Sequence, residues 1–277
     1  MLAFPAMARV PGPFGGTRFR AEVQAIEAAS RGRLGVAVLD PDGSRFAWRG
    51  GERFAMCSTF KALLAAAVLA RVDAGTERLD RSVPVSKADL VAYAPFSETR
   101  VGGTATLAEL CAAAVGISDN AAANLLLATV GGPAGLTRFL RRTGDPATRL
   151  DRTEPTLNTA LPGDPRDTTT PLAMARTLQR LTQGRVLTPG SRAQLVAWMT
   201  AATTGGKRLR AGLTAGWRVA DKTGTGANGT NNVVALLWPA GGTTPLVVAS
   251  YLTGSTLPDA EKDAVHARLA RAIASAV

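Results

Sequence analysis

Two side chains at the start of an apolar stretch could perform nucleophilic catalysis. Ser58 precedes the stretch 59–74, whose apolar residues predict a buried helix, and Lys61 follows three residues later. That spacing places both side chains on one face of a helix. A serine hydroxyl needs a base to attack at neutral pH, and a lysine in a tight, apolar site can lose its proton and serve as that base. The alternative interpretation is a helix-capping serine followed by a lysine that reaches from a core helix to solvent.

Two further short motifs carry polar side chains suited to catalysis. Ser118-Asp119-Asn120 lies between the predicted helices 107–115 and 120–129, where caps and turns alone would also explain it. Lys222 and the two residues after it spell K-T-G at the end of a predicted strand, 217–222.

The glycines after Lys222 include a G-x-G-x-x-G pattern, formed by Gly224, Gly226 and Gly229. That pattern binds a dinucleotide only where a helix follows. Here a predicted strand follows at 233–238, so we expect a hairpin and exclude dinucleotide binding.

Taken together, S-x-x-K, S-D-N and K-T-G in this order are the motif set of class A β-lactamases and penicillin-binding proteins. From about residue 17 onward the chain resembles class A β-lactamases specifically. The resemblance implies that Ser58 is the nucleophile, Lys61 a base, and Ser118 the donor of a proton to the leaving nitrogen. It also implies an oxyanion hole from the backbone N–H groups of Ser58 and Thr225. The substrate-binding positions that it implies are Tyr93, Asn120, Asn158, Arg208, Lys222, Thr223, Gly224 and Thr225.

The irregular stretch 144–170 separates β-lactamases from penicillin-binding proteins. It resembles the family's Ω-loop, which we expect at about 150–168. Glu154 and Asn158 match the residues that hold the hydrolytic water. Arg152 and Asp167 match the ion pair at the neck of the loop, and Asn124 matches the side chain that ties the loop to the helical lobe.

The sequence departs from the family pattern at the position used for the substrate carboxylate. Asn231 stands where many members have an arginine, and Arg208 matches the alternative arginine of other members.

Cys57 and Cys111 match cysteines that form disulfides in some members, but the partner positions here are Gly226 and Ala65. We therefore expect two free, buried thiols.

The composition excludes several other functions. The formal charge is +11, but the arginines are scattered and aromatic residues make up only 5%, so we expect no nucleic-acid partner. Two cysteines and one histidine, His266, assemble no metal site, and we expect His266 to be a surface or packing residue. We predict no metal and no cofactor.

No apolar run is long enough to span a membrane, and residues 1–16 lack a secretory signal pattern.

The element pattern explains how these residues could meet. Strands are predicted near both chain ends, at 34–40, 44–49, 217–222, 233–238 and 246–251, and helices fill the middle. Helices are also predicted at 17–31, 134–142, 171–182, 191–202 and 259–277. This order predicts an α/β fold of the α+β type: an antiparallel sheet from 17–50 and 207–277, and an inserted all-helical lobe, 51–206. The site would lie in the cleft between the lobes.

The resemblance thus implies a monomeric hydrolase acting on β-lactams such as penicillins and cephalosporins, with an acyl-enzyme on Ser58 and a water activated by Glu154. Because such compounds act outside the cytoplasm, the resemblance implies a secreted or periplasmic protein. Two alternatives stay open at this point: a peptidase-like protein that only forms the acyl-enzyme, and a non-catalytic β-lactam sensor.

Overall fold

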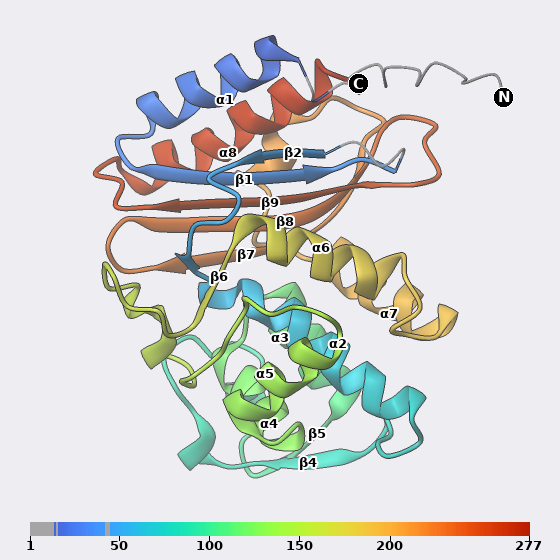
Figure 1. Ribbon diagram of the computed structural model, residues 1–277. Helices are drawn as coiled ribbons and strands as arrows, with labels where there is room; N and C mark the ends of the chain where they lie inside the picture. The colour runs from blue at the N-terminus through green and yellow to red at the C-terminus, as the bar shows by residue number, and fades with distance from the viewer. Residues whose placement is uncertain (1–13, 15, 42–44) are drawn as a thin grey trace, which may run out of the picture.

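The computed structural model describes residue 14 and residues 16–41 and 45–277. Its central feature is a five-stranded antiparallel sheet in the order β2-β1-β9-β8-β7 (Figure 1). The strands are β1 (Arg33–Leu39), β2 (Arg45–Trp48), β7 (Arg218–Gly226), β8 (Thr230–Trp238) and β9 (Leu246–Thr253). The sheet is therefore built from both ends of the chain, as the sequence predicted.

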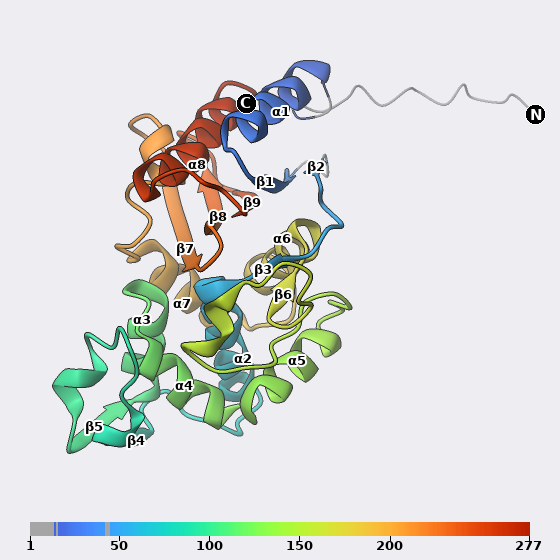
Figure 2. The ribbon, with the colours of Figure 1, turned by 90° about the vertical axis from the view of Figure 1, so that its left-hand side faces the viewer.

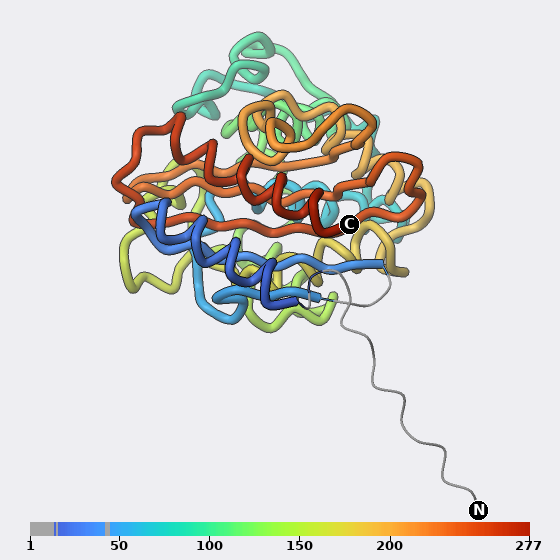
Figure 3. The backbone as a smooth tube through the Cα atoms, turned by 90° about the horizontal axis from the view of Figure 1, so that it is seen from above, coloured from blue at the N-terminus to red at the C-terminus, as the bar shows by residue number. Residues whose placement is uncertain are grey.

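Helices cover both faces of this sheet. The first and last helices, α1 (Thr17–Ala29) and α8 (Asp259–Ala274), lie together on one face, as Figure 3 shows from above. Helix α6 (Pro171–Thr182) packs against β1 and β9 on the other face. The helical lobe lies beyond it (Figure 1). The placement of the lobe boundaries at residues 50 and 206 remains a prediction.

The helical lobe is organised around α2 (Phe60–Asp73), in which Phe60–Leu69 are all buried. This helix is apolar all round because α3, α4, α5 and α7 contact it. Those helices are α3 (Leu107–Gly116), α4 (Asn120–Thr129), α5 (Gly132–Arg142) and α7 (Pro189–Thr200). The predicted buried helix at 59–74 is confirmed.

Short elements complete the lobe. Two small sheets pair β3 (Phe54–Ala55) with β6 (Thr168–Thr169), and β4 (Ser82–Val85) with β5 (Gly103–Thr106). The 3-10 turns are Cys57–Thr59, Lys87–Asp89, Ser97–Arg100, Thr156–Thr159 and Leu209–Gly212. None of these four strands was predicted, because two to four residues carry little periodicity. Strand β2, also four residues long, was predicted from the turn signal beside it.

The prediction was wrong about where the strand carrying K-T-G ends. The prediction placed its end at the motif, whereas β7 continues through Lys222-Thr223-Gly224 to Gly226 and pairs with β8 along that whole length. Strand β8 likewise begins at Thr230, before the predicted residue 233. Glycines suggest a turn locally, but the partner strand supplies the hydrogen bonds that hold them extended.

Strands β1 and β2 form the hairpin expected near the start of the sheet, and they pair as predicted. Its turn was predicted at 41–43, and residues 42 and 43 lie outside the described residues. In the part of the chain that the structure describes, no helix is both long and apolar enough to cross a membrane.

Candidate active site

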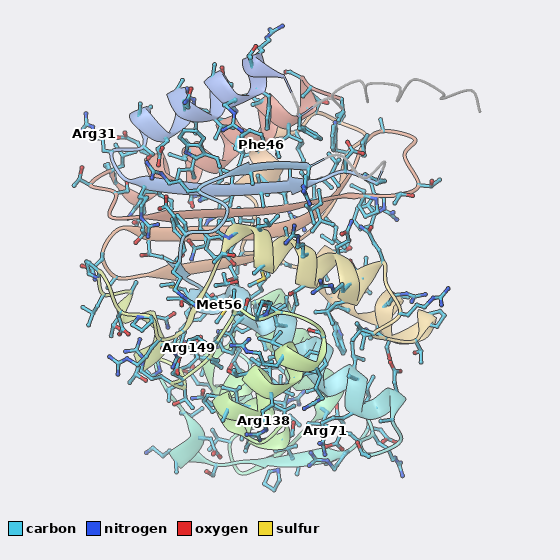
Figure 4. The ribbon with its side chains drawn as sticks, in the orientation of Figure 1. Arg31, Phe46, Met56, Arg71, Arg138 and Arg149 are labelled. Carbon is cyan, nitrogen blue, oxygen red and sulfur yellow. The ribbon has the colours of Figure 1, made fainter. Side chains whose placement is uncertain are left out.

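Ser58 lies in the 3-10 turn that leads into α2, at the wall of a 510 Å³ pocket between the lobes. Its neighbour Cys57 has a φ of 46°, in the left-handed region. Such a conformation in a non-glycine residue costs about 1–3 kcal/mol, which the surrounding structure must offset. Strand β7 passes so close to this turn that a methyl group at Gly224 would lie 2.7 Å from Met56 O and 3.2 Å from Ser58 N. Figure 4 labels Met56, which lies where the two lobes meet.

The hydroxyl of Ser58 and the ammonium of Lys61 meet at one carboxylate oxygen. Ser58 Oγ donates to Glu154 Oε1 at 3.3 Å, and Lys61 Nζ lies 3.0 Å from the same oxygen. Lys61 is fully buried, and burial lowers its pKa although the negative charge of Glu154 opposes the shift. The two groups that could take the serine proton are therefore in contact with each other.

Ser118 lies between two lysines. Its Oγ accepts from Lys222 Nζ at 3.0 Å and from Lys61 Nζ at 3.4 Å, and its carbonyl accepts from Lys61 at 2.8 Å. Lys222 is also fully buried, and burial together with the positive charge of Lys61 holds its pKa well below the ordinary value. Because the two lysine amino groups donate to the lone pairs of Ser118 Oγ, the hydroxyl proton of Ser118 is available for donation to another group.

The segment that carries Glu154 is pinned at three points. Asn124 binds the Glu154 backbone through both of its amide atoms, at 2.9 Å each. Asn158 Nδ2 donates to Glu154 Oε2 at 2.5 Å, while Asn158 Oδ1 is buried and has no protein partner among the described residues. At the neck of the loop, Arg152 Nε lies 2.5 Å from Asp167 Oδ2. The expected Arg152–Asp167 ion pair and the Asn124 tie are thus present.

Asn120 and Tyr93 line the opposite wall of the pocket. Asn120 Oδ1 accepts from Lys61 at 2.5 Å, and its Nδ2 donates to Ala92 O at 2.7 Å. One lone pair and one N–H of its amide stay available to a substrate. Tyr93 is 59% exposed at the mouth of the pocket.

Comparisons with known proteins identify the family to which this chain is related. The sequence model of the β-lactamase enzyme family matches residues 18–277. β-Lactamase Toho-1 of Escherichia coli is 53% identical over 233 residues, which are 84% of this chain and 80% of that protein. β-Lactamase CTX-M-8 of Citrobacter amalonaticus is 52% identical over the same shares.

Among solved structures, an ancestral class A β-lactamase superposes with a TM-score of 0.92 at 59% identity, over 94% of this chain and 100% of that one. The putative class A β-lactamase PenP of Rhodopseudomonas palustris superposes with a TM-score of 0.92 at 54% identity and the same coverage. The chain belongs to the class A β-lactamase family.

In this class A β-lactamase, Arg208 lines one end of the pocket. Its Nε pairs with Asp263 at 2.8 Å, its Nη1 donates to Gly224 O at 2.9 Å and to Asn232 O at 2.5 Å, and its Nη2 donates to Thr225 Oγ1 at 2.7 Å. A guanidinium has five N–H donors, so one on Nη2 remains for a ligand. Because Thr225 Oγ1 accepts from Arg208, its own hydroxyl proton is also free to be donated.

The sequence reasoning missed Asp263, which α8 contributes to this end of the site. Its Oδ1 accepts from Arg208 and also from Asn231 Nδ2 at 3.0 Å. A carboxylate in the first turns of a C-terminal helix carries no local signal for such a contact. The side chain of Lys222 has no exposed surface, whereas Thr223, Thr225 and Arg208 line the pocket.

The two cysteines of the β-lactamase are free and buried, as predicted. Burial raises the pKa of Cys57 to about 12. A Cβ at Gly226 would lie 2.6 Å from Cys57 Sγ, so only glycine fits beside this thiol. Within the described ranges, no three His, Cys, Asp or Glu side chains gather in a way that could hold a metal ion.

His266 is a buried packing residue and does not line the pocket. Its Nε2 is 3.0 Å from Asn231 O and its Nδ1 is 2.9 Å from Ser250 Oγ. A carbonyl only accepts, so Nε2 carries the proton and Nδ1 accepts from the serine.

Proposed function

We propose that this protein hydrolyses the amide bond of β-lactam antibiotics through an acyl-enzyme on Ser58, which a water activated by Glu154 then releases. The observation that supports this proposal most is the shared oxygen Glu154 Oε1, in contact with both Ser58 Oγ and Lys61 Nζ. One carboxylate is thereby placed to act on the nucleophile and on the ester that forms from it.

In the first step, Ser58 Oγ attacks the lactam carbonyl and loses its proton. The direct contact favours Glu154 as the first acceptor of that proton, with Lys61 linked to the same oxygen. The backbone N–H groups of Ser58 and Thr225 would stabilise the oxyanion where β7 crosses the turn before α2. Ser118 would then give its hydroxyl proton to the leaving nitrogen and regain one from Lys61, which in turn takes the serine proton from Glu154 and leaves it a carboxylate for the second step.

In the second step, a water must attack the ester from the side of the Ω-loop. Glu154 can accept a proton from that water, and the unpartnered Oδ1 of Asn158 can accept its other hydrogen. A protein that only forms the acyl-enzyme has no need of such a pair. The arrangement therefore supports hydrolysis over the peptidase-like and sensor alternatives.

The substrate class follows from the anionic end of the pocket. Penicillins and cephalosporins carry a carboxylate near the lactam, and Arg208, Thr223 and Thr225 present cationic and hydroxyl donors to it. We propose that the protein acts without a cofactor, as a monomer, and without nucleic-acid or membrane partners. We further propose that it works in the periplasm or outside the cell, where such compounds act.

The test is steady-state hydrolysis of benzylpenicillin and a chromogenic cephalosporin. We expect many turnovers per molecule in the parent protein and none with Ser58→Ala. A parent that reacts only once per molecule, or that instead releases D-alanine from a D-alanyl-D-alanine peptide, would contradict the proposal.

A further inference from the structure

A second hollow lies on the far side of the Ω-loop from Ser58. This pocket of about 540 Å³, which we call the rear pocket, is bounded by loop residues 160–166 and by residues 32–33 and 253–254 at the end of the sheet. Figure 2 views the molecule from the side on which the Ω-loop lies. The rear pocket shares no lining residue with the pocket around Ser58. Its volume is in the range typical of small-molecule sites.

The lining of the rear pocket is strongly basic. Its charged residues are Arg33, Arg53, Arg152, Arg166 and Asp164. Three of these arginines pair with carboxylates: Arg33 with Glu52 at 2.9 Å, Arg152 with Asp167 at 2.5 Å, and Arg166 with Asp164 at 2.9 Å. These carboxylates compensate the charges of the three arginines, so the three do not by themselves indicate an anion-binding site.

Arg53 differs from the other three. Its Nη1 donates to Ala147 O at 3.0 Å and to Thr168 Oγ1 at 2.9 Å, and both acceptors are neutral. No carboxylate pairs with it in the part of the chain that the structure describes. The guanidinium is held in place while its charge stays uncompensated, and three of its N–H groups remain available to a ligand.

The same pocket also has an apolar wall. Leu161 is 52% exposed there, and Pro162 and Pro165 stand beside it. The ring of Phe54 is covered by the Arg33 guanidinium, 3.9 Å from the ring centroid. An exposed leucine gains from contact with an apolar group, whereas a bare inorganic anion would leave it in water.

We propose that the rear pocket binds a small organic anion with an apolar body, such as an aryl phosphate or an aryl carboxylate. Its acid group binds Arg53 and its body lies against Leu161. One wall of the pocket belongs to the Ω-loop and the other to the sheet and β3, so the ligand joins the two. The amides of residues 160–168 then exchange with solvent more slowly when the ligand is bound.

Phenyl phosphate is the probe, and inorganic phosphate, which lacks the apolar body, is the control ligand. Binding is followed by NMR chemical-shift titration of the 277-residue chain, which also locates the site. We expect saturable shifts at residues 53–55 and 160–166, with a dissociation constant of about 1 mM. Hydrogen–deuterium exchange with and without the probe gives the second readout.

Matched variants separate the site from general surface charge. Arg53→Gln is expected to weaken phenyl phosphate binding tenfold or more, and Arg53→Lys to retain most of it. Arg71→Gln removes another exposed positive charge, from α2, and is expected to change the affinity less than twofold. Leu161→Ser is expected to weaken phenyl phosphate binding but not that of inorganic phosphate.

Three results would overturn the proposal. Shifts confined to the Ser58 pocket would place the anion there instead. Equal losses in Arg53→Gln and Arg71→Gln would show binding to general surface charge. Equal affinities for phenyl phosphate and inorganic phosphate would show that the apolar wall plays no part.

Discussion

The single histidine of the chain makes a sharp test of the packing between α8 and the sheet. Burial, reinforced by the nearby charge of Arg208, lowers the pKa of His266 from 6.5 to about 3. The backbone carbonyl of Asn231 and the carboxylate of Asp263 act in the opposite direction and do not cancel the shift. His266 is therefore neutral in the folded protein above about pH 4.

The sign of the stability effect follows from this lowered pKa. Below about pH 6.5 the unfolded chain binds a proton at His266, whereas the folded protein does not. The free energy of unfolding therefore decreases as the pH is lowered, until about pH 3. With these two pKa values, the loss between pH 7.5 and pH 5.0 is about 2 kcal/mol from this residue alone.

Two assays check this prediction. Because the chain has one histidine, its ring resonances are unambiguous in NMR, and we expect the Nε2–H tautomer with no titration between pH 8 and pH 5. Urea unfolding at pH 7.5 and pH 5.0 gives the free-energy change. His266→Gln keeps a donor and an acceptor without a titrating group, so its loss on acidification should be about 2 kcal/mol smaller. A ring that titrates near pH 6.5 would show that the pKa of His266 is not lowered. Equal losses of unfolding free energy in the parent and His266→Gln would show that this residue does not cause the acid destabilisation.

Three further predictions follow from the site and its supports. Arg208→Ala should raise KM for carboxylate-bearing β-lactams tenfold or more in steady-state assays, with a smaller effect on kcat. A tenfold rise corresponds to about 1.4 kcal/mol of lost binding free energy. An unchanged KM would exclude Arg208 from carboxylate binding. Asp167→Asn should lower the free energy of unfolding in urea by about 2–4 kcal/mol, because Arg152 loses its buried partner; a change under about 0.5 kcal/mol would show that the pair does not hold the loop. The buried thiols of Cys57 and Cys111 should not react with a thiol reagent at pH 8 until urea unfolds the protein, since burial raises the pKa of both; rapid labelling of the folded protein would contradict that burial.

Much of the site could be predicted because its residues stand in short motifs. Ser58, Ser118 and Lys222 each belong to a pattern that is weak alone, and their order along the chain made the resemblance specific. The helices were predicted for a different reason: apolar residues recur with helical spacing, and threonine or aspartate caps mark where several helices begin.

What escaped prediction depends on contacts between distant residues. Asp263 and Arg208 are 55 residues apart in the chain, so only the folded structure shows that one fixes the other. The sequence also could not show that Ser58 and Lys61 share an oxygen of Glu154, since helix spacing predicted only that the first two face the same way. The extension of β7 through its glycines was missed because strand pairing, not local propensity, decides it.

The central claim is that Glu154 drives release of the acyl group from Ser58. Its most direct test is the intact mass of Glu154→Gln after mixing with benzylpenicillin, compared with the parent and with Glu22→Gln, which changes an exposed glutamate on α1. We expect a persistent adduct of one penicillin per molecule in Glu154→Gln, and only unmodified protein in the other two once substrate is consumed. Unmodified Glu154→Gln with turnover near that of the parent would contradict it.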